Sequence, residues 1–181
     1  MNDTISDTDT APTEGIAAAL QRLRRLLDAR PRGPRTTSVT ATLGSRLTCT
    51  TEIGITTVAT DVSPALGGTA SAPTPSELLY TALASCLAIG YRMRAAERGI
   101  ELTHVRVTVE GDADVTGMLT PCATSPGATA LRYRVEIDSP APADEVAAIV
   151  DIADRLSPVL ADLTRPVPAT RTLAINAGTA A

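Results

Sequence analysis

The segment from Thr74 to Gly99, TPSELLYTALASCLAIGYRMRAAERG, constrains the fold more than any other part of this chain. It predicts one long helix, because Thr74 can cap it, Pro75 suits its first turn and Glu77 lies where a capping box needs a carboxylate. Gly99 predicts its end. Apolar residues lie nearly all around this helix: Leu78, Leu79, Ala82, Leu83, Ala84, Cys86, Leu87, Ala88, Ile89 and Met93. Such a helix belongs in a core or between subunits.

The other segments predict a mixture of strands and helices. Residues 36–61 are rich in Thr and Val with turns at Gly44 and Gly54, which indicates three short strands. Two further segments alternate apolar and polar residues, 101–112 and 131–138, and predict half-buried strands with His104 on the exposed side. Helices are expected at 143–156 and 159–164, and a last strand at 169–176. Because helices and strands do not strictly alternate, the fold class is expected to be α+β.

The N-terminal region is expected to lie outside the main domain. Residues 1–13 have no periodic apolar residues and are expected to be disordered. Residues 14–30 have apolar residues at helical spacing, which predicts an amphipathic helix that packs on the domain or on a second subunit. Residues 31–35, PRGPR, form a linker, so the main domain is assigned to residues 36–176.

Composition excludes several function classes. The 181 residues include three Tyr, no Phe and no Trp, and the net charge is −4, so a nucleic-acid partner is not expected. No apolar run is long enough to span a membrane, and the N-terminus lacks the pattern of a secretory signal. Three unclustered cysteines and one histidine favour a reduced, cytoplasmic compartment and argue against a zinc site or other metal cofactor.

Three segments in this order resemble the OsmC/Ohr family of peroxide-related proteins. They are LGGTASAPTPSELLYTALASC at residues 66–86, RGIELTHVRVTVEGDAD at 98–114 and RLSPVLADLTRPV at 155–167. The resemblance runs from about Thr36 to Ile175. It implies an OsmC-like fold in which antiparallel strands surround a long buried central helix, and an intertwined homodimer with its sites at the interface.

The resemblance also implies candidate site residues. Cys86 matches the reactive cysteine, which attacks a hydroperoxide and becomes a sulfenic acid, and Glu77 matches the family's glutamate. Arg46 is the candidate for the arginine that polarises the thiol. The second cysteine of the family is replaced by Ser157, so the usual disulfide cannot form there, although Cys122 is a possible substitute.

Each candidate also has a simpler interpretation. Cys86 can be a small buried apolar residue, Glu77 a helix cap and Arg46 a solvated turn residue. Nine residues separate Glu77 from Cys86, about 13.5 Å along a helix, so Glu77 could serve only the Cys86 of a partner subunit. Asp61 resembles an acidic position in another branch of the family.

Two functions remain open at this point. The first is reduction of an organic hydroperoxide, a protection against oxidative stress, with Cys86 as the single reactive thiol and an external thiol as reductant. The alternative is a non-catalytic dimer of the same fold that binds an apolar small molecule at its interface. A cation within reach of Cys86 would favour the first, because a thiolate next to a cation is the reactive form.

Overall fold

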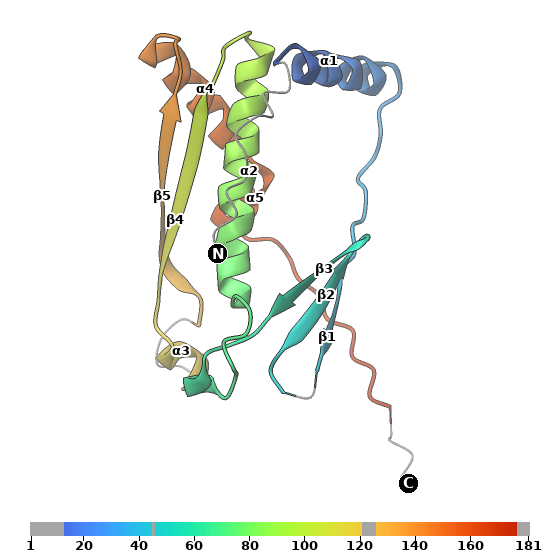
Figure 1. The fold of residues 1–181 in the computed structure, drawn as a ribbon. Helices are drawn as coiled ribbons and strands as arrows, with labels where there is room; N and C mark the ends of the chain where they lie inside the picture. Colours follow the sequence, from blue (N-terminus) through green and yellow to red (C-terminus); the bar gives the residue numbers. More distant parts are fainter. Residues whose placement is uncertain (1–12, 45, 121–125, 177–181) are drawn as a thin grey trace.

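The computed structural model describes residues 13–44, 46–120 and 126–176 and contains two antiparallel sheets and several helices (Figure 1). The expected α+β class is confirmed. Residues 1–12, most of the segment expected to be disordered, and Cys122 lie outside the described residues. The elements in chain order are α1 (Thr13–Ala29), β1 (Thr40–Leu43), β2 (Cys49–Ile53), β3 (Thr56–Thr60), the 3-10 turn η1 (Pro64–Leu66), α2 (Pro75–Glu97), β4 (His104–Ala113), α3 (Thr116–Leu119), β5 (Ala128–Asp138), α4 (Ala143–Arg155) and α5 (Pro158–Thr164).

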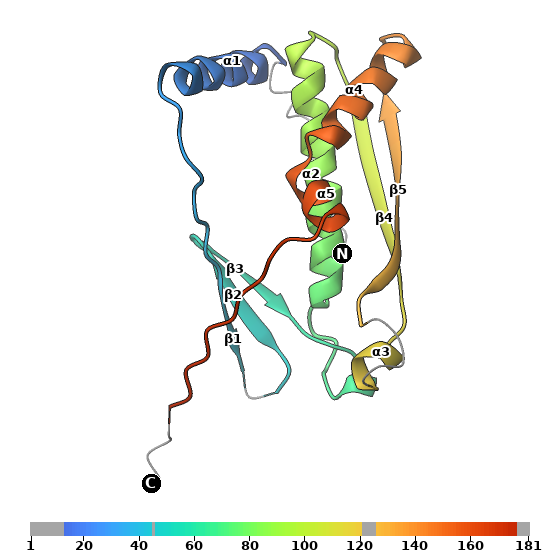
Figure 2. The ribbon, with the colours of Figure 1, turned by 180° about the vertical axis from the view of Figure 1, so that it is seen from behind.

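Helix α2 is the central element, and the hairpin β4–β5 and helices α4 and α5 pack around it (Figures 1 and 2). Its residues Leu83, Leu87, Tyr91 and Ala95 follow one another at four-residue spacing, so they share one face, and all four are buried. That face packs with Ile149 and Ala153 of α4 and with the apolar side chains of the hairpin. The core of the domain therefore lies between α2, α4 and β4–β5.

The opposite side of α2 is only partly covered within the chain. Helix α1 packs against α2, and Ala96 is buried, whereas Ile89, two turns earlier on the same side as Ala96, is 61% exposed. Leu79, near the start of the helix, is also 45% exposed. The expectation of a helix buried on all sides is therefore met along one side, and on the other side only near the C-terminal end of the helix. The apolar character of the other side has no explanation within a single copy of the chain.

A shared carboxylate ties three elements of the core together. Tyr91 of α2 donates a hydrogen bond to Asp154 Oδ1 of α4, and Tyr133 of β5 donates one to Asp154 Oδ2, both at 2.8 Å. Burial and the neighbouring Asp154 raise the pKa of Tyr133 to about 12 and raise the pKa of Tyr91 even further. Both tyrosines therefore remain protonated donors, and they fix how α4 sits on α2 and the hairpin.

The sheet β1–β2–β3 is set apart from the core (Figure 1). It forms an antiparallel meander, as expected, in which Thr51 pairs with Ala41 on one side and with Val58 on the other. Most of its side chains are exposed. The loop that follows β3 connects this sheet to the start of α2.

Two segments differ from the sequence-based expectations. Residues 166–176, expected to contain the last strand, run without secondary structure, because the alternation of Leu173 and Ile175 meets no pairing strand among the described residues. The segment 118–129, expected to be a loop, includes the end of the short helix α3 and the start of β5. The remaining helices and strands lie within a few residues of the expected bounds.

Asp61 organises the loop that leads into α2. Its side chain is 1% exposed, and its two oxygens accept hydrogen bonds from the Val62 backbone and from both the backbone and the hydroxyl of Thr69 and Ser71, at 2.6–3.1 Å. Gly68 lies so close that any side chain there would overlap the Val62 carbonyl and the Asp61 carboxylate. These donors, above all the Thr69 hydroxyl, hold the pKa of Asp61 well below its usual range.

We predict that Asp61→Asn lowers the melting temperature by about 5–10 °C. The NH₂ group of Asn would replace one carboxylate oxygen, and this new donor would face the hydrogen-bond donors of the loop without an acceptor. The pKa of Asp61 is depressed in the folded state, so its contribution to stability is present above the unfolded pKa of about 3.9 and is lost as the pH falls further. The difference between wild type and variant should therefore be constant from pH 7 to about 5 and shrink below about 4.

Thermal unfolding followed by circular dichroism at several pH values would measure this effect. Asp162→Asn is the matched control, because Asp162 is an exposed carboxylate on α5 and has no hydrogen bond or ion pair among the described residues. An equal loss of stability in both variants would contradict the role assigned to Asp61.

Candidate functional site

Cys86 and Ser157 are brought together although they are far apart in the sequence. The distance between Cys86 Sγ and Ser157 Oγ is 3.4 Å, within the range of a hydrogen bond that involves sulfur. Cys86 lies in the middle of α2, at the border between its buried and exposed sides, and it is half-buried. The fold thus brings into contact the two positions that the resemblance assigns to the reactive cysteine and to the second cysteine.

Ser157 is held in place by its role as the N-cap of α5. Its side chain is buried, and its oxygen accepts a hydrogen bond from the Leu160 backbone at 3.3 Å, while Pro158 occupies the first turn as expected. Because the oxygen already accepts this bond, the hydroxyl hydrogen is free to point at the sulfur of Cys86. Ser157 can therefore donate to a thiolate or to an oxygen attached to that sulfur.

The Cys86 thiol lines a cavity of about 300 Å³ between α2 and the end of α4, which we call the Cys86 cavity. Its wall is mostly apolar, and Arg94 is the one charged side chain among the described residues that line it. A small apolar group therefore fits next to the thiol. The lining residues are Cys86, Ile89, Gly90, Met93, Arg94, Ala153, Leu156, Ser157 and Pro158.

Arg94 was not among the residues predicted from the sequence. It is two turns after Cys86 on α2, and its guanidinium pairs with Glu97 at 2.7 Å. Arg24 of α1 pairs with the other oxygen of Glu97. The eight-residue spacing of Cys86 and Arg94 places them about 80° apart around the helix and about 12 Å apart along its axis, so they line the same cavity at different heights, and this spacing is a signal the sequence contained.

Glu77 acts as a helix cap in this chain. Its carboxylate accepts hydrogen bonds from the Thr74 backbone at 2.6 Å and from the Thr74 hydroxyl at 2.9 Å, and Thr74 in turn accepts from the Glu77 backbone. The bonds from Thr74 lower the pKa of Glu77. Glu77 does not line the Cys86 cavity, so the simpler interpretation of this residue describes what it does within one copy of the chain.

Arg46 is likewise separate from Cys86 within the chain. It lies in the turn between β1 and β2, is exposed, and has no ion pair with any residue in the described part of the chain. That turn belongs to the sheet that Figure 1 shows apart from α2 and α5. The structure thus brings together Cys86 and Ser157, but not Glu77 and Arg46.

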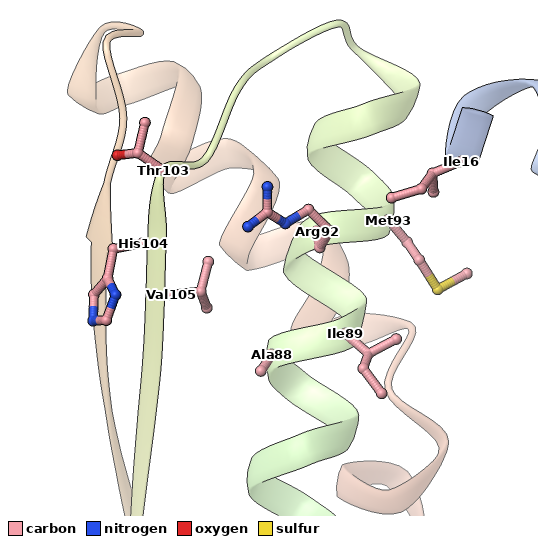
Figure 3. Close-up of a pocket in the computed structure, with 8 residues that line it drawn as sticks. All are labelled: Ile16, Ala88, Ile89, Arg92, Met93, Thr103, His104 and Val105. Carbon is pink, nitrogen blue, oxygen red and sulfur yellow. The ribbon is translucent and has the colours of Figure 1, made fainter. Parts of the chain in front are cut away.

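A second and more open hollow, of about 600 Å³, lies between α2, β4 and the start of α1 (Figure 3). Val105 points from β4 toward α2, and Arg92 points from α2 toward β4. His104 is exposed at its edge, as expected from the alternation of this strand. Ile89 and Met93 line both this hollow and the Cys86 cavity, so the two adjoin each other around the exposed side of α2.

The described ranges contain neither a cluster of metal ligands nor a membrane-spanning helix. In residues 13–44, 46–120 and 126–176, no three side chains of His, Cys, Asp or Glu come together as metal ligands would. Across the same ranges, no helix is both long and apolar enough to cross a lipid bilayer.

Solved structures with the same fold cover most of the chain. An OsmC-like protein from Mycoplasma pneumoniae is 20% identical with a TM-score of 0.64, and the alignment covers 73% of this chain and 89% of that one. The organic hydroperoxide resistance protein OsmC from Legionella pneumophila is 22% identical with a TM-score of 0.54, covering 73% and 91%. An organic hydroperoxide resistance protein from Elizabethkingia anophelis, solved with thiocyanate bound, is 16% identical with a TM-score of 0.53, covering 72% and 89%.

These likenesses are at the level of the fold, and no curated protein matches the sequence closely enough to count as a relative. The family model described as OsmC-like protein matches residues 68–171, which include α2 with Cys86 and α5 with its cap Ser157. This match covers more than half of the chain, and it agrees with the resemblance found in the sequence. The chain therefore belongs to the family of OsmC-like proteins.

Proposed function

We propose that this protein reduces organic hydroperoxides through Cys86 as its single reactive thiol. The observation that carries the proposal is the Cys86 cavity, in which the thiol, the Ser157 hydroxyl and an arginine share a small apolar space. Two of the proteins with the same fold are named for resistance to organic hydroperoxides, which supports the same chemistry. An apolar wall favours hydroperoxides with a carbon substituent over hydrogen peroxide.

The reaction has two stages. The Cys86 thiolate attacks the outer oxygen of the hydroperoxide, so an S–O bond forms while the O–O bond breaks. The sulfur is oxidised by two electrons to a sulfenic acid, and the hydroperoxide leaves as an alcohol after taking up a proton. An external thiol then displaces water from the sulfenic acid to give a mixed disulfide, and a second thiol releases reduced Cys86 and leaves as the oxidised reductant.

Ser157 has a defined part in this scheme. Its hydroxyl can donate to the thiolate and to the oxygen of the sulfenic acid, but it cannot form a disulfide. Residue 157 therefore cannot resolve the sulfenic acid of Cys86, and a thiol from elsewhere must react with it. We infer an external dithiol or a low-molecular-weight thiol as reductant.

We further propose that the protein acts as a homodimer. The exposed apolar side chains of α2, Leu79 and Ile89, and the exposed faces of the sheet β1–β3 are surfaces that a second copy would cover. In such a dimer we expect Glu77 and Arg46 to approach the Cys86 of the partner subunit; within one chain, neither lines the Cys86 cavity.

The first prediction concerns selective oxidation. When reduced protein is mixed anaerobically with cumene hydroperoxide, Cys86 should gain one oxygen far faster than Cys49, and the reaction should be absent in Cys86→Ser. Cumene hydroperoxide should react about tenfold faster than hydrogen peroxide, because burying on the order of 60 Å² of apolar surface contributes about 1.5 kcal/mol. Mass spectrometry of each cysteine peptide measures both rates.

Cys49 provides an internal control, because it is a half-buried thiol outside the Cys86 cavity. If Cys86 reacts no faster than Cys49, the proposed enzyme activity is wrong. The fold would then be better explained by binding of an apolar molecule without chemistry.

The second prediction concerns the position of Ser157. In Ser157→Cys, one equivalent of cumene hydroperoxide should yield a disulfide between Cys86 and the introduced thiol, because the side chain at position 157 contacts Cys86 Sγ at 3.4 Å and a small side-chain movement would bring the two sulfurs to the bonding distance of about 2.05 Å. Wild type and Ser157→Ala should instead give a sulfenic acid that dimedone traps. Non-reducing peptide mapping distinguishes these products, and a persistent dimedone adduct in Ser157→Cys would argue against this geometry.

The third prediction concerns the dimer. Light scattering should give twice the chain mass of 18.7 kDa for wild type. Leu79→Glu should shift the protein toward the monomer, because a buried unpaired carboxylate at an interface is costly. Ala147→Glu, on the exposed face of α4, is the matched control and should remain dimeric. A monomeric wild type would refute the proposed assembly.

A further inference from the structure

We infer that helix α1 is part of the Cys86 site, because the ion pairs Arg24–Glu97–Arg94 set the positive charge that the Cys86 cavity presents to a reactant. The inference rests on the proposed function in one respect, because it takes Cys86 as the reacting group. It assigns a positioning role to two residues, Arg24 and Glu97, neither of which lines the cavity.

The three side chains form a continuous chain from α1 to the cavity. One oxygen of Glu97 pairs with Arg24 of α1, and the other pairs with Arg94 one turn earlier on α2. Arg94 and Glu97 are mostly buried, whereas Arg24 is largely exposed. One carboxylate is thus shared by two guanidinium groups, and the set of three carries a net positive charge.

Arg94 is the member that reaches the cavity. The other lining residues come from α2, α4 and the α4–α5 junction, and none of them is charged. Asp154 of α4 lies next to this region, but its two oxygens accept hydrogen bonds from Tyr91 and Tyr133 on the core side. The charge at the Cys86 cavity is therefore set by how far Glu97 neutralises Arg94.

Arg24 changes that neutralisation. Arg24 adds its own positive charge to the Glu97–Arg94 pair, so the three groups together carry a net charge of about +1. Without Arg24, Glu97 and Arg94 would form a neutral pair, and the cavity would become less attractive to anions. Helix α1 precedes residues 68–171, the part of the chain that the family model matches. The effect of Arg24 on the charge at the Cys86 cavity therefore comes from an extension of the domain.

The test compares two alkylating reagents of similar size and different charge. Iodoacetate is an anion and iodoacetamide is neutral, and both alkylate the thiolate of Cys86. The ratio of their two rates on the full-length protein therefore reports the charge at the cavity. A change in thiol reactivity or partial unfolding would alter both rates together and leave the ratio nearly unchanged.

The expected changes in this ratio follow the ion-pair chain. Arg94→Gln should lower it about three- to tenfold and Arg24→Gln about two- to fivefold at low ionic strength, whereas Arg94→Lys should largely retain it. Arg25→Gln is the matched control, because Arg25 lies next to Arg24 on α1, is exposed and has no ion pair among the described residues. Adding 1 M salt should reduce the differences.

The outcomes separate this inference from the proposed function. An unchanged ratio in Arg24→Gln, or an equal change in Arg25→Gln, would overturn the role of α1 even if Cys86 reacts with hydroperoxides. A lowered ratio confined to Arg24→Gln and Arg94→Gln would support it even if hydroperoxides fail to oxidise Cys86, because alkylation requires no peroxide.

Discussion

The burial of one side of α2 against the hairpin β4–β5 and α4 is the interaction on which the rest of the structure depends. It fixes which residues of an evenly apolar helix face the core, and it therefore also fixes which residues lie at its border. Cys86 is at that border, one position before the buried Leu87, where α5 meets α2. A rotation of the helix by one residue, about 100°, would remove the thiol from Ser157 and from the Cys86 cavity.

Local signals in the sequence predicted most of the elements, because each depends on residues close together in the chain. The capping box of Thr74 and Glu77 and the cap formed by Ser157 before Pro158 are of this kind, and both are present. The expected last strand at 169–176 failed for the opposite reason. Alternation can predict a strand, but a strand also needs a neighbour, and the part of the chain that the structure describes pairs none with Leu173 and Ile175.

The candidate site was predictable only in part. Residues within recognisable motifs could be found, whereas residues whose role depends on packing between distant segments could not. Cys86 and Ser157 were found through motifs, whereas Arg94 was missed because its relevance depends on where α4 and α5 pack against α2. Glu77 and Arg46 could be selected by resemblance, yet one chain cannot bring them to Cys86. Residues that meet only across an interface leave no trace in the periodicity of either element.

The partly covered side of α2 bears on both the assembly of the protein and the chemistry of Cys86. Ile89 and Met93 line both the Cys86 cavity and the neighbouring hollow that reaches Ile16 of α1 (Figure 3). A second copy that covers this side would close the hollow and deepen the cavity, which would exclude water from the thiol. Ion pairs such as Arg24–Glu97 and Arg94–Glu97 strengthen when water is excluded, since the effective dielectric constant falls. Assembly and the influence of α1 on Cys86 would then reinforce each other.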